Sequence, residues 1–411
     1  MFKKSNSIMK KLLFSVLTLL LLTFAIDTNA QCVENPPGSG NYTLPDGSDC
    51  TNTIITAVPF LRIVPDARSG AMGDAGIATS ADANGIHHNA SKLAFVEQDL
   101  SFSATYTPWL RALGLNDVYL AYLTGFKKID DLSTLGFGLR FFSLGEINYT
   151  SDAGEALGTG KPNEFEINVG YARKLAENLS LSVGGKFIYS NLAAGQRVGD
   201  VDINAGVAGA VDFGLTFKKP IELSNSESNL TLGLAVTNLG TKISYTNSIN
   251  RDFIPTNLGV GAAWSFDFDE YNSFTITSDI NKLLVPTPCL GGDCDEDGNG
   301  ISDFKEQSVV SGILSSFSDA QGGASEEFRE LMYSFGLEYW YDKQFAVRAG
   351  YYSEAQTKGN RQFFTVGLGL KYNVFGLNFS YLVPTTNQRN PLDNTLRFSL
   401  IFDFEAFEAQ K

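Results

Sequence analysis

One stretch of this chain has the residue spacing of a metal-binding loop. Oxygen-bearing side chains occupy positions 1, 3, 5, 9 and 12 of residues 295–306, and glycine occupies position 6. This is the pattern of the EF-hand calcium loop, in which the glycine permits a sharp turn. The alternative is a solvated acidic turn without a metal, because Asp, Asn and Gly are common turn residues. We expect a structural calcium ion whose ligands are Asp295, Asp297, Asn299, the backbone carbonyl of Ile301, Asp303 and Glu306.

The four cysteines fall into two close pairs, Cys32 with Cys50 and Cys289 with Cys294. In a chain exported to an oxidising compartment, this spacing predicts two local disulfides. The second disulfide would lie just before the calcium loop. Free thiols or a zinc site are the alternatives, but the two pairs lie far apart in the chain and only two histidines are available as further zinc ligands.

Those histidines, His87 and His88, are also the residues on which an enzymatic function would depend. A membrane hydrolase needs a serine and a histidine within hydrogen-bond reach, with a third group that orients the histidine. No Gly-x-Ser-x-Gly motif stands between a strand and a helix. We therefore predict that the protein is not an enzyme. The hydrolase alternative would require loss of activity when either histidine is replaced.

The elements that must position these residues are strands. From Leu100 to Phe404, apolar residues fall on every second position in about fourteen short runs, which predicts strands with one apolar face. A soluble sandwich could show the same alternation. However, the connectors alternate between short and long, as in outer-membrane barrels. We predict a transmembrane β-barrel over residues 99–405 with both termini in the periplasm, and the longest connector, 283–330, carries the calcium loop.

The residues before the barrel divide into three predicted segments. Lys10 and Lys11 precede an apolar run from Leu12 to Ala25, so residues 1–30 read as a signal peptide. Residues 31–50 are expected to be a periplasmic extension. Residues 51–98 are rich in glycine and alanine and are expected to form a plug in the lumen. Residues 406–411 would be a short tail. The net charge of −14 argues against a nucleic-acid partner.

Two motifs in the plug segment carry a family resemblance. The stretch Gly70-Ala-Met-Gly-Asp-Ala-Gly76 and the following Ala81 to Ala94 resemble the plug signature of FadL-type barrels. The segment from Val58 to Arg68, Val-Pro-Phe-Leu-Arg-Ile-Val-Pro-Asp-Ala-Arg, is more specific and resembles the PorV family of the type IX secretion system. The resemblance implies an all-β fold, a fourteen-stranded antiparallel transmembrane barrel of FadL type with an N-terminal plug segment.

The same resemblance implies a function and partners. Members of this family collect cargo, through its C-terminal signal domain, from the SprA translocon and pass it to the attachment complex containing the PorU sortase. Outer-membrane lipid would surround the barrel. Aromatic residues in the predicted outer loops are candidate cargo contacts because interface cores are rich in aromatics, although each could simply pack loops together: Tyr149, Tyr245 and Phe253. The alternative function is a FadL-like transporter of a hydrophobic small molecule.

Overall fold

The computed structural model of the chain describes residues 32–34, 42–44, 46–111, 114–150, 154–198, 201–223, 226–246, 251–290, 294–386 and 394–404. It divides into two compact units, residues 1–50 and 51–411. In the first unit, β1 (Val33–Glu34) pairs antiparallel with β2 (Tyr42–Thr43), and a disulfide joins Cys32 to Cys50 as predicted. The predicted signal peptide and the 406–411 tail lie outside the described residues.

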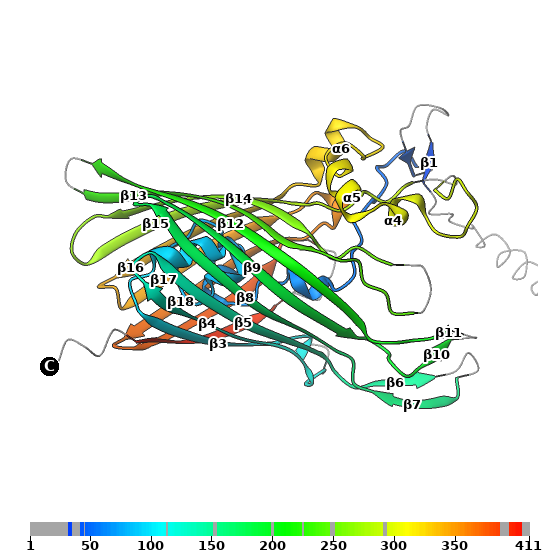
Figure 1. Cartoon of the computed structure of the whole chain (residues 1–411), viewed down its shortest axis with the longest axis horizontal. Helices are drawn as coiled ribbons and strands as arrows, with labels where there is room; N and C mark the ends of the chain where they lie inside the picture. Colours follow the sequence, from blue (N-terminus) through cyan, green and yellow to red (C-terminus); the bar gives the residue numbers. More distant parts are fainter. Residues whose placement is uncertain are drawn as a thin grey trace, which may run out of the picture. The chain divides into compact units, whose positions relative to one another are not determined.

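The second unit is a closed antiparallel barrel of fourteen described strands, which confirms the predicted fold (Figure 1). Its last strand pairs with its first, from Phe398 opposite Tyr106 to Phe404 opposite Leu100, so the sheet has no free edge. The strands are β3 (Leu100–Pro108), β4 (Val118–Asp130), β5 (Ser133–Leu144), β8 (Asn163–Ala176), β9 (Leu179–Asn191), β12 (Gly206–Leu223), β13 (Ser226–Gly240), β14 (Asn257–Asp267), β15 (Asn272–Leu283), β16 (Met332–Tyr341), β17 (Phe345–Ser353), β18 (Gln362–Tyr372), β19 (Phe375–Pro384) and β20 (Leu396–Phe404).

The two faces of each strand differ in the way the alternating sequence predicts. In β8, Ile167 and Val169 point outward and are 46% and 48% exposed, whereas the inward-pointing Glu166 is fully buried. An apolar outer face suits hydrocarbon, and a polar inner face can be paired within the lumen. None of the helices in the described part of the chain is long and apolar enough to cross a bilayer.

Long and short connectors lie at opposite ends of the barrel (Figure 1). The connector predicted over Lys218 to Asn229 is instead a continuation of two paired strands, and the pairing extends to Leu223 opposite Ser226. At the other end the long connectors contain hairpins and short helices: β6 (Ile147–Thr150), β7 (Ala156–Gly160), β10 (Arg197–Val198), β11 (Val201–Asp202), α4 (Asp303–Glu306), α5 (Val309–Ser315), α6 (Ala324–Arg329) and the 3-10 helix η4 (Gln356–Lys358).

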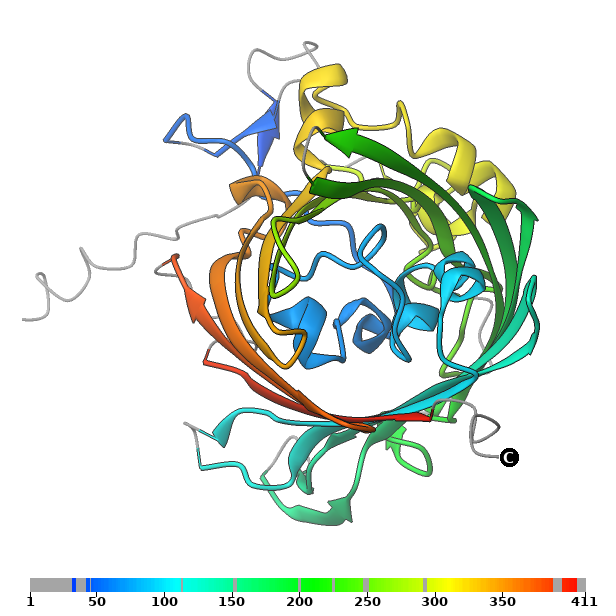
Figure 2. The same ribbon diagram turned by 90° about the vertical axis from the view of Figure 1, so that its left-hand side faces the viewer.

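Residues 51–98 fold inside the ring of strands, where their short helices are seen in blue down the barrel axis (Figure 2). This plug packs against the wall so closely that a Cβ added to Gly350 of β17 would overlap the backbone nitrogen of Gly73. Gly73 itself has a φ of +65°, a conformation that favours glycine. The plug elements are η1 (Pro59–Arg62), α2 (Ala67–Gly70), α3 (Gly85–His88) and η2 (Ala90–Phe95).

The plug threads the barrel from one end to the other. At its start, the Asn52 N–H donates to the Thr357 carbonyl (2.8 Å) and the Ala57 N–H to the Phe253 carbonyl (2.9 Å), both in long connectors. At its end the chain enters β3 beside the short turns, the same end at which Phe404 closes β20. The barrel unit therefore begins and ends at opposite mouths. Residues 31–50 belong to the other compact unit, and the periplasmic location of that extension and of both termini stays a prediction.

Candidate functional site

A buried ion pair fastens the start of the plug to the barrel wall. Arg140 of β5 and Glu166 of β8 face the lumen, and their Nη2 and Oε1 atoms are 2.7 Å apart. The other terminal nitrogen of Arg140 donates to the carbonyls of Phe60 (3.0 Å) and Ile63 (2.9 Å) in the plug. Both charged side chains are fully buried. Buried charges need partners of this kind, so the arrangement fixes the plug backbone as well as the charges.

A second buried network holds the middle of the plug. Arg68 of α2 lies 2.7 Å from Glu338 of β16 and 3.0 Å from Asp82, farther along the plug. Glu338 also accepts from Arg348 of β17 at 2.7 Å. Two cations thus share one carboxylate between the plug and two strands. Lumen-facing charges on the strands are what the alternating pattern predicts, and their partners include the plug.

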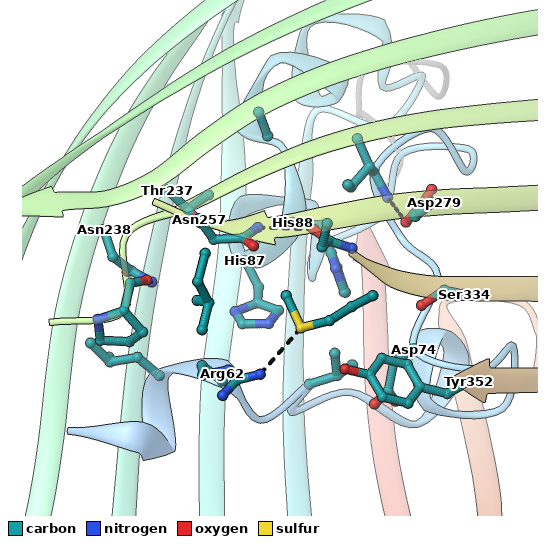
Figure 3. Close-up of a pocket in the computed structure, with 18 of the residues that line it drawn as sticks. Arg62, Asp74, His87, His88, Thr237, Asn238, Asn257, Asp279, Ser334 and Tyr352 are labelled. Carbon is teal, nitrogen blue, oxygen red and sulfur yellow. Dashed lines mark hydrogen bonds between the residues drawn. The ribbon is translucent and has the colours of Figure 1, made fainter. Parts of the chain in front are cut away.

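A small cavity of about 110 Å³ lies between the plug and the wall (Figure 3). Charged and polar groups line much of it, including Arg62, Asp74, both histidines and Asp279. In Figure 3, His87 and His88 lie side by side near its centre. His88 pairs with Asp66 at 3.3 Å and His87 contacts the Arg140 guanidinium at 2.9 Å, so both histidines join the plug's own polar network.

At the long-connector mouth, an acidic centre joins the plug to the wall. Glu354, just after β17, accepts from Arg361 and from Arg62 of the plug. Burial by itself would raise the pKa of Glu354, but the two arginine charges and the Tyr352 hydroxyl outweigh burial and hold this pKa below its ordinary range. The mouth of the barrel is therefore tied together by charges that stay ionised at neutral pH.

The longest connector is tied to the same mouth. Lys358 of η4 contacts Glu326 at 2.6 Å and Glu330 at 2.9 Å, and Lys282 at the end of β15 contacts Glu327 at 3.0 Å. These acids lie in and just after α6. No local sequence pattern predicts this cluster, because its acids and lysines are separated by 28 to 45 residues. The run Glu326-Glu327-Phe-Arg-Glu330 was the only local signal.

The predicted calcium loop lies within this connector, and several of its expected ligands converge. Carboxylate oxygens of Asp295, Asp297 and Asp303 lie within 4.8 Å of one another. The side-chain amide of Asn299 bridges Asp297 and Glu306, with both distances 2.9 Å. The glycine at position 6, Gly300, has a φ of +84°, as the sharp turn requires. A disulfide joins Cys289 to Cys294 just before the loop, the pairing that the sequence predicts.

The three aromatic residues considered for cargo binding differ in their surroundings. Phe253 is 6% exposed and packs against Gly312 of α5, with the Lys242 ammonium 4.2 Å from its ring centre. Tyr245 is half-buried and its hydroxyl donates to Ser190. Only Tyr149, on the β6–β7 hairpin, stands apart from the core of the mouth. Phe253 is therefore buried among the loops in this arrangement, and cargo binding by the three aromatic residues stays a prediction.

The longest connector also exposes several apolar side chains that no sequence pattern predicts. Val310 and Leu314 stand four residues apart on α5 and are 68% and 69% exposed, and Phe328 of α6 is 69% exposed. Four-residue spacing places Val310 and Leu314 on one helix face. Val310 and Leu314 therefore form an exposed apolar pair on α5.

The sequence matches a protein-family model described as "Type IX secretion system protein PorV" over residues 47–290, more than half of the chain. The chain belongs to the PorV family. It is therefore a component of the type IX secretion system, as the motifs from Val58 to Ala94 suggest, and its closed barrel places it in the outer membrane. No curated protein matches the sequence significantly.

Solved structures with a similar course of the chain include three bacterial proteins. They are the toluene transporter TbuX of Ralstonia pickettii (11% identity, TM-score 0.45, covering 83% of this chain and 98% of that one), the toluene transporter TodX of Pseudomonas putida (11%, 0.46, 83% and 98%) and a FadL homologue of Pseudomonas aeruginosa (10%, 0.40, 87% and 100%). These likenesses are too distant to transfer a ligand or an activity to this chain.

Proposed function

We propose that this protein is a non-enzymatic shuttle of the type IX secretion system. In this proposal it binds the C-terminal signal domain of cargo leaving the SprA translocon and delivers the cargo to the PorU-type sortase complex at the cell surface. The observation that carries the proposal is the plug, which threads the lumen and is held there by buried ion pairs such as Arg140 with Glu166. A barrel closed in this way is suited to binding at its mouth.

The luminal cavity favours the shuttle over a FadL-like transporter. A carrier of hydrophobic small molecules needs an apolar pocket, and ligand pockets usually enclose about 300–1,000 Å³. The cavity beside the plug measures about 110 Å³ and is lined by charged side chains that are already paired, such as Arg62 and His88. Its size and polarity suit water better than a hydrocarbon ligand.

The cargo surface would lie at the long-connector mouth. Here the exposed apolar side chains of α5 and α6 stand on a connector that is tied to the wall by buried charge pairs. A preorganised apolar surface binds a folded partner with less loss of conformational entropy than a free loop would. Leu314 and Phe328 are the side chains that we expect to contribute most.

The test is affinity purification from outer membranes in mild detergent, with all co-purifying proteins identified by mass spectrometry. Wild-type protein should recover a very large barrel together with secreted proteins that share a C-terminal domain. Leu314→Asp with Phe328→Asp should reduce cargo recovery at least about tenfold, which corresponds to about 1.4 kcal/mol. Ile129→Asp is the matched control, because Ile129 is 58% exposed at the opposite mouth. Recovery of the barrel alone, carrying a fatty acid, would instead favour the transporter.

We further propose that residues 295–306 bind a calcium ion as a structural clip. The support is the match at every ligand position and the convergence of the carboxylates of Asp295, Asp297 and Asp303. A divalent cation would remove the repulsion among these acids. Because the disulfide precedes the loop and α4 forms its last four residues, calcium would order the connector that presents α5 and α6.

A further inference from the structure

The outer wall of the barrel contains an apolar groove that the shuttle function does not use. The groove is a shallow, open hollow that crosses the outward face of strands β8, β9, β12 and β13. Its lining is almost entirely apolar and includes Ile167, Val169, Phe187, Val211 and Leu239.

Two outward-pointing glycines create the groove. Gly185 of β9 pairs with Val211 of β12, and Gly209 of β12 pairs with Phe187 of β9, so the two missing side chains lie diagonally on neighbouring strands. A Cβ added to Gly185 would meet nothing within 4 Å, and one added to Gly209 would meet only the Lys186 carbonyl at 4.0 Å. The flanking Val211 is 39% exposed, so its side chain projects farther from the wall than the two glycines do.

The long connector closes the groove at its outer end. Val309, the first residue of α5, lines the groove beside Gly240 and Thr241 at the end of β13. Gly312, on the next turn of α5, packs against Pro286 and Phe253, which holds the helix on the barrel rim. Figure 2 shows the helices of this connector, in yellow, outside the ring of strands. The groove therefore runs along the membrane-facing wall and ends beneath a fixed helix.

Charged groups gather at the end closed by α5. Lys242 follows the groove residue Thr241, and its Nζ donates to the Lys305 carbonyl at 2.6 Å. The Lys305 ammonium in turn pairs with Asp252 at 2.8 Å. Arg251 and Glu306 also act on Lys242 electrostatically. These charges lie where the groove leaves the wall, and Lys242 and Lys305 are paired there with groups of the connectors.

We propose that this groove binds one acyl chain of a membrane lipid. The wall on which the groove lies faces hydrocarbon, and an unfilled groove would forfeit contacts along its whole length. A straight chain is flexible enough to fill it, and its methylene groups match the apolar lining. Covered by α5, the lipid would also support the connector that carries the calcium loop.

The test uses photolabelling with a phosphatidylglycerol that carries a diazirine in one acyl chain, in liposomes that contain the whole protein. Labelled peptides identified by mass spectrometry should concentrate on residues 185–187, 207–211 and 239–241 compared with the outward residues of β17. Gly185→Leu combined with Gly209→Leu fills the groove and should reduce that labelling several-fold. Ala349→Leu, which enlarges one outward side chain of β17, is the control and should leave the labelling unchanged.

Each outcome bears on the proposal. Uniform labelling around the barrel, or unchanged labelling of the groove in the double variant, would overturn it. Shielding of the groove by a co-purifying polypeptide would overturn it as well, in favour of a protein contact. If the double variant does not reach the folded form on electrophoresis without heating, the distribution of labels on the wild-type wall decides alone.

Discussion

Replacing Arg140 with methionine should loosen the plug, and the cost can be worked out from its contacts. Methionine has a similar length but leaves Glu166 as a buried charge without its 2.7 Å partner. Breaking a buried pair by removing one member costs about 3–5 kcal/mol. The change also leaves the carbonyls of Phe60 and Ile63 without their donor. We expect Arg140→Met to lower the free energy of unfolding by at least this amount.

The double variant Arg140→Met with Glu166→Gln separates charge burial from hydrogen bonding. With no ionised group left in the pair, the remaining cost is that of the lost bonds to two plug carbonyls, about 1 kcal/mol each. The double variant should therefore be more stable than the single one, by about 1–3 kcal/mol. This reversal is the signature of an ion pair whose main cost is the lone charge left behind.

The measurement is guanidinium unfolding of the detergent-solubilised barrel, followed by tryptophan fluorescence, together with conductance in planar bilayers. The single variant should show a lower unfolding midpoint and a larger pore conductance because the plug is released more easily. Arg173→Met, which removes an exposed arginine from β8, should change neither quantity. Equal stability of the single and double variants would refute the reasoning, since it would show that the isolated Glu166 charge costs nothing.

Three further perturbations test other parts of the structure. Chelation should lower the melting temperature of the wild type, by the equivalent of about 2.7 kcal/mol if calcium had been present at about 100 times its Kd, and should leave Asp295→Ala with Glu306→Ala unchanged. Because its folded pKa lies below the ordinary value, Glu354 stabilises the mouth above that value and loses this effect as the pH falls through the folded pKa. Acid titration of protease resistance should therefore show a transition that Glu354→Gln lacks, and an identical titration in both would contradict the role of Arg361. Gly350→Ala should cost about 1–3 kcal/mol in denaturant unfolding, because its methyl group would overlap the plug backbone, and an unchanged midpoint would contradict that packing.

The barrel could be predicted because its information is local. Within one strand, every second side chain must suit hydrocarbon, so the run from Phe165 to Tyr171 marks β8 without reference to any other part of the chain. Beyond the apolar band of the wall, the alternation no longer marks the strands. The strands on either side of Leu223 and Ser226 remain paired although their residues read as a connector, because backbone pairing needs no apolar side chain.

The calcium loop and the luminal network differ in the same way. All expected ligands between Asp295 and Glu306 are neighbours in sequence, so the spacing alone brings them together. By contrast, Arg68 and Glu338 are 270 residues apart, and the alternation could predict only that Glu338 faces inward. The sequence alone does not predict the course of the plug for this reason. Its course depends on hydrogen bonds such as that from Asn52 to Thr357, which no local sequence pattern predicts.

The contacts of Asn52 join several segments of the long-connector mouth into one bonded network. Its backbone is bonded to the β17–β18 connector and its side chain donates to Glu326 of the longest connector at 3.1 Å. Glu326 in turn pairs with Lys358, which also contacts Glu330. The start of the plug, the β17–β18 connector and α6 therefore share a single network of bonds. Since these groups are mostly buried, weakening one contact exposes the others to water. A partner bound at this mouth would thus meet a preformed surface whose rigidity depends on the plug remaining in place.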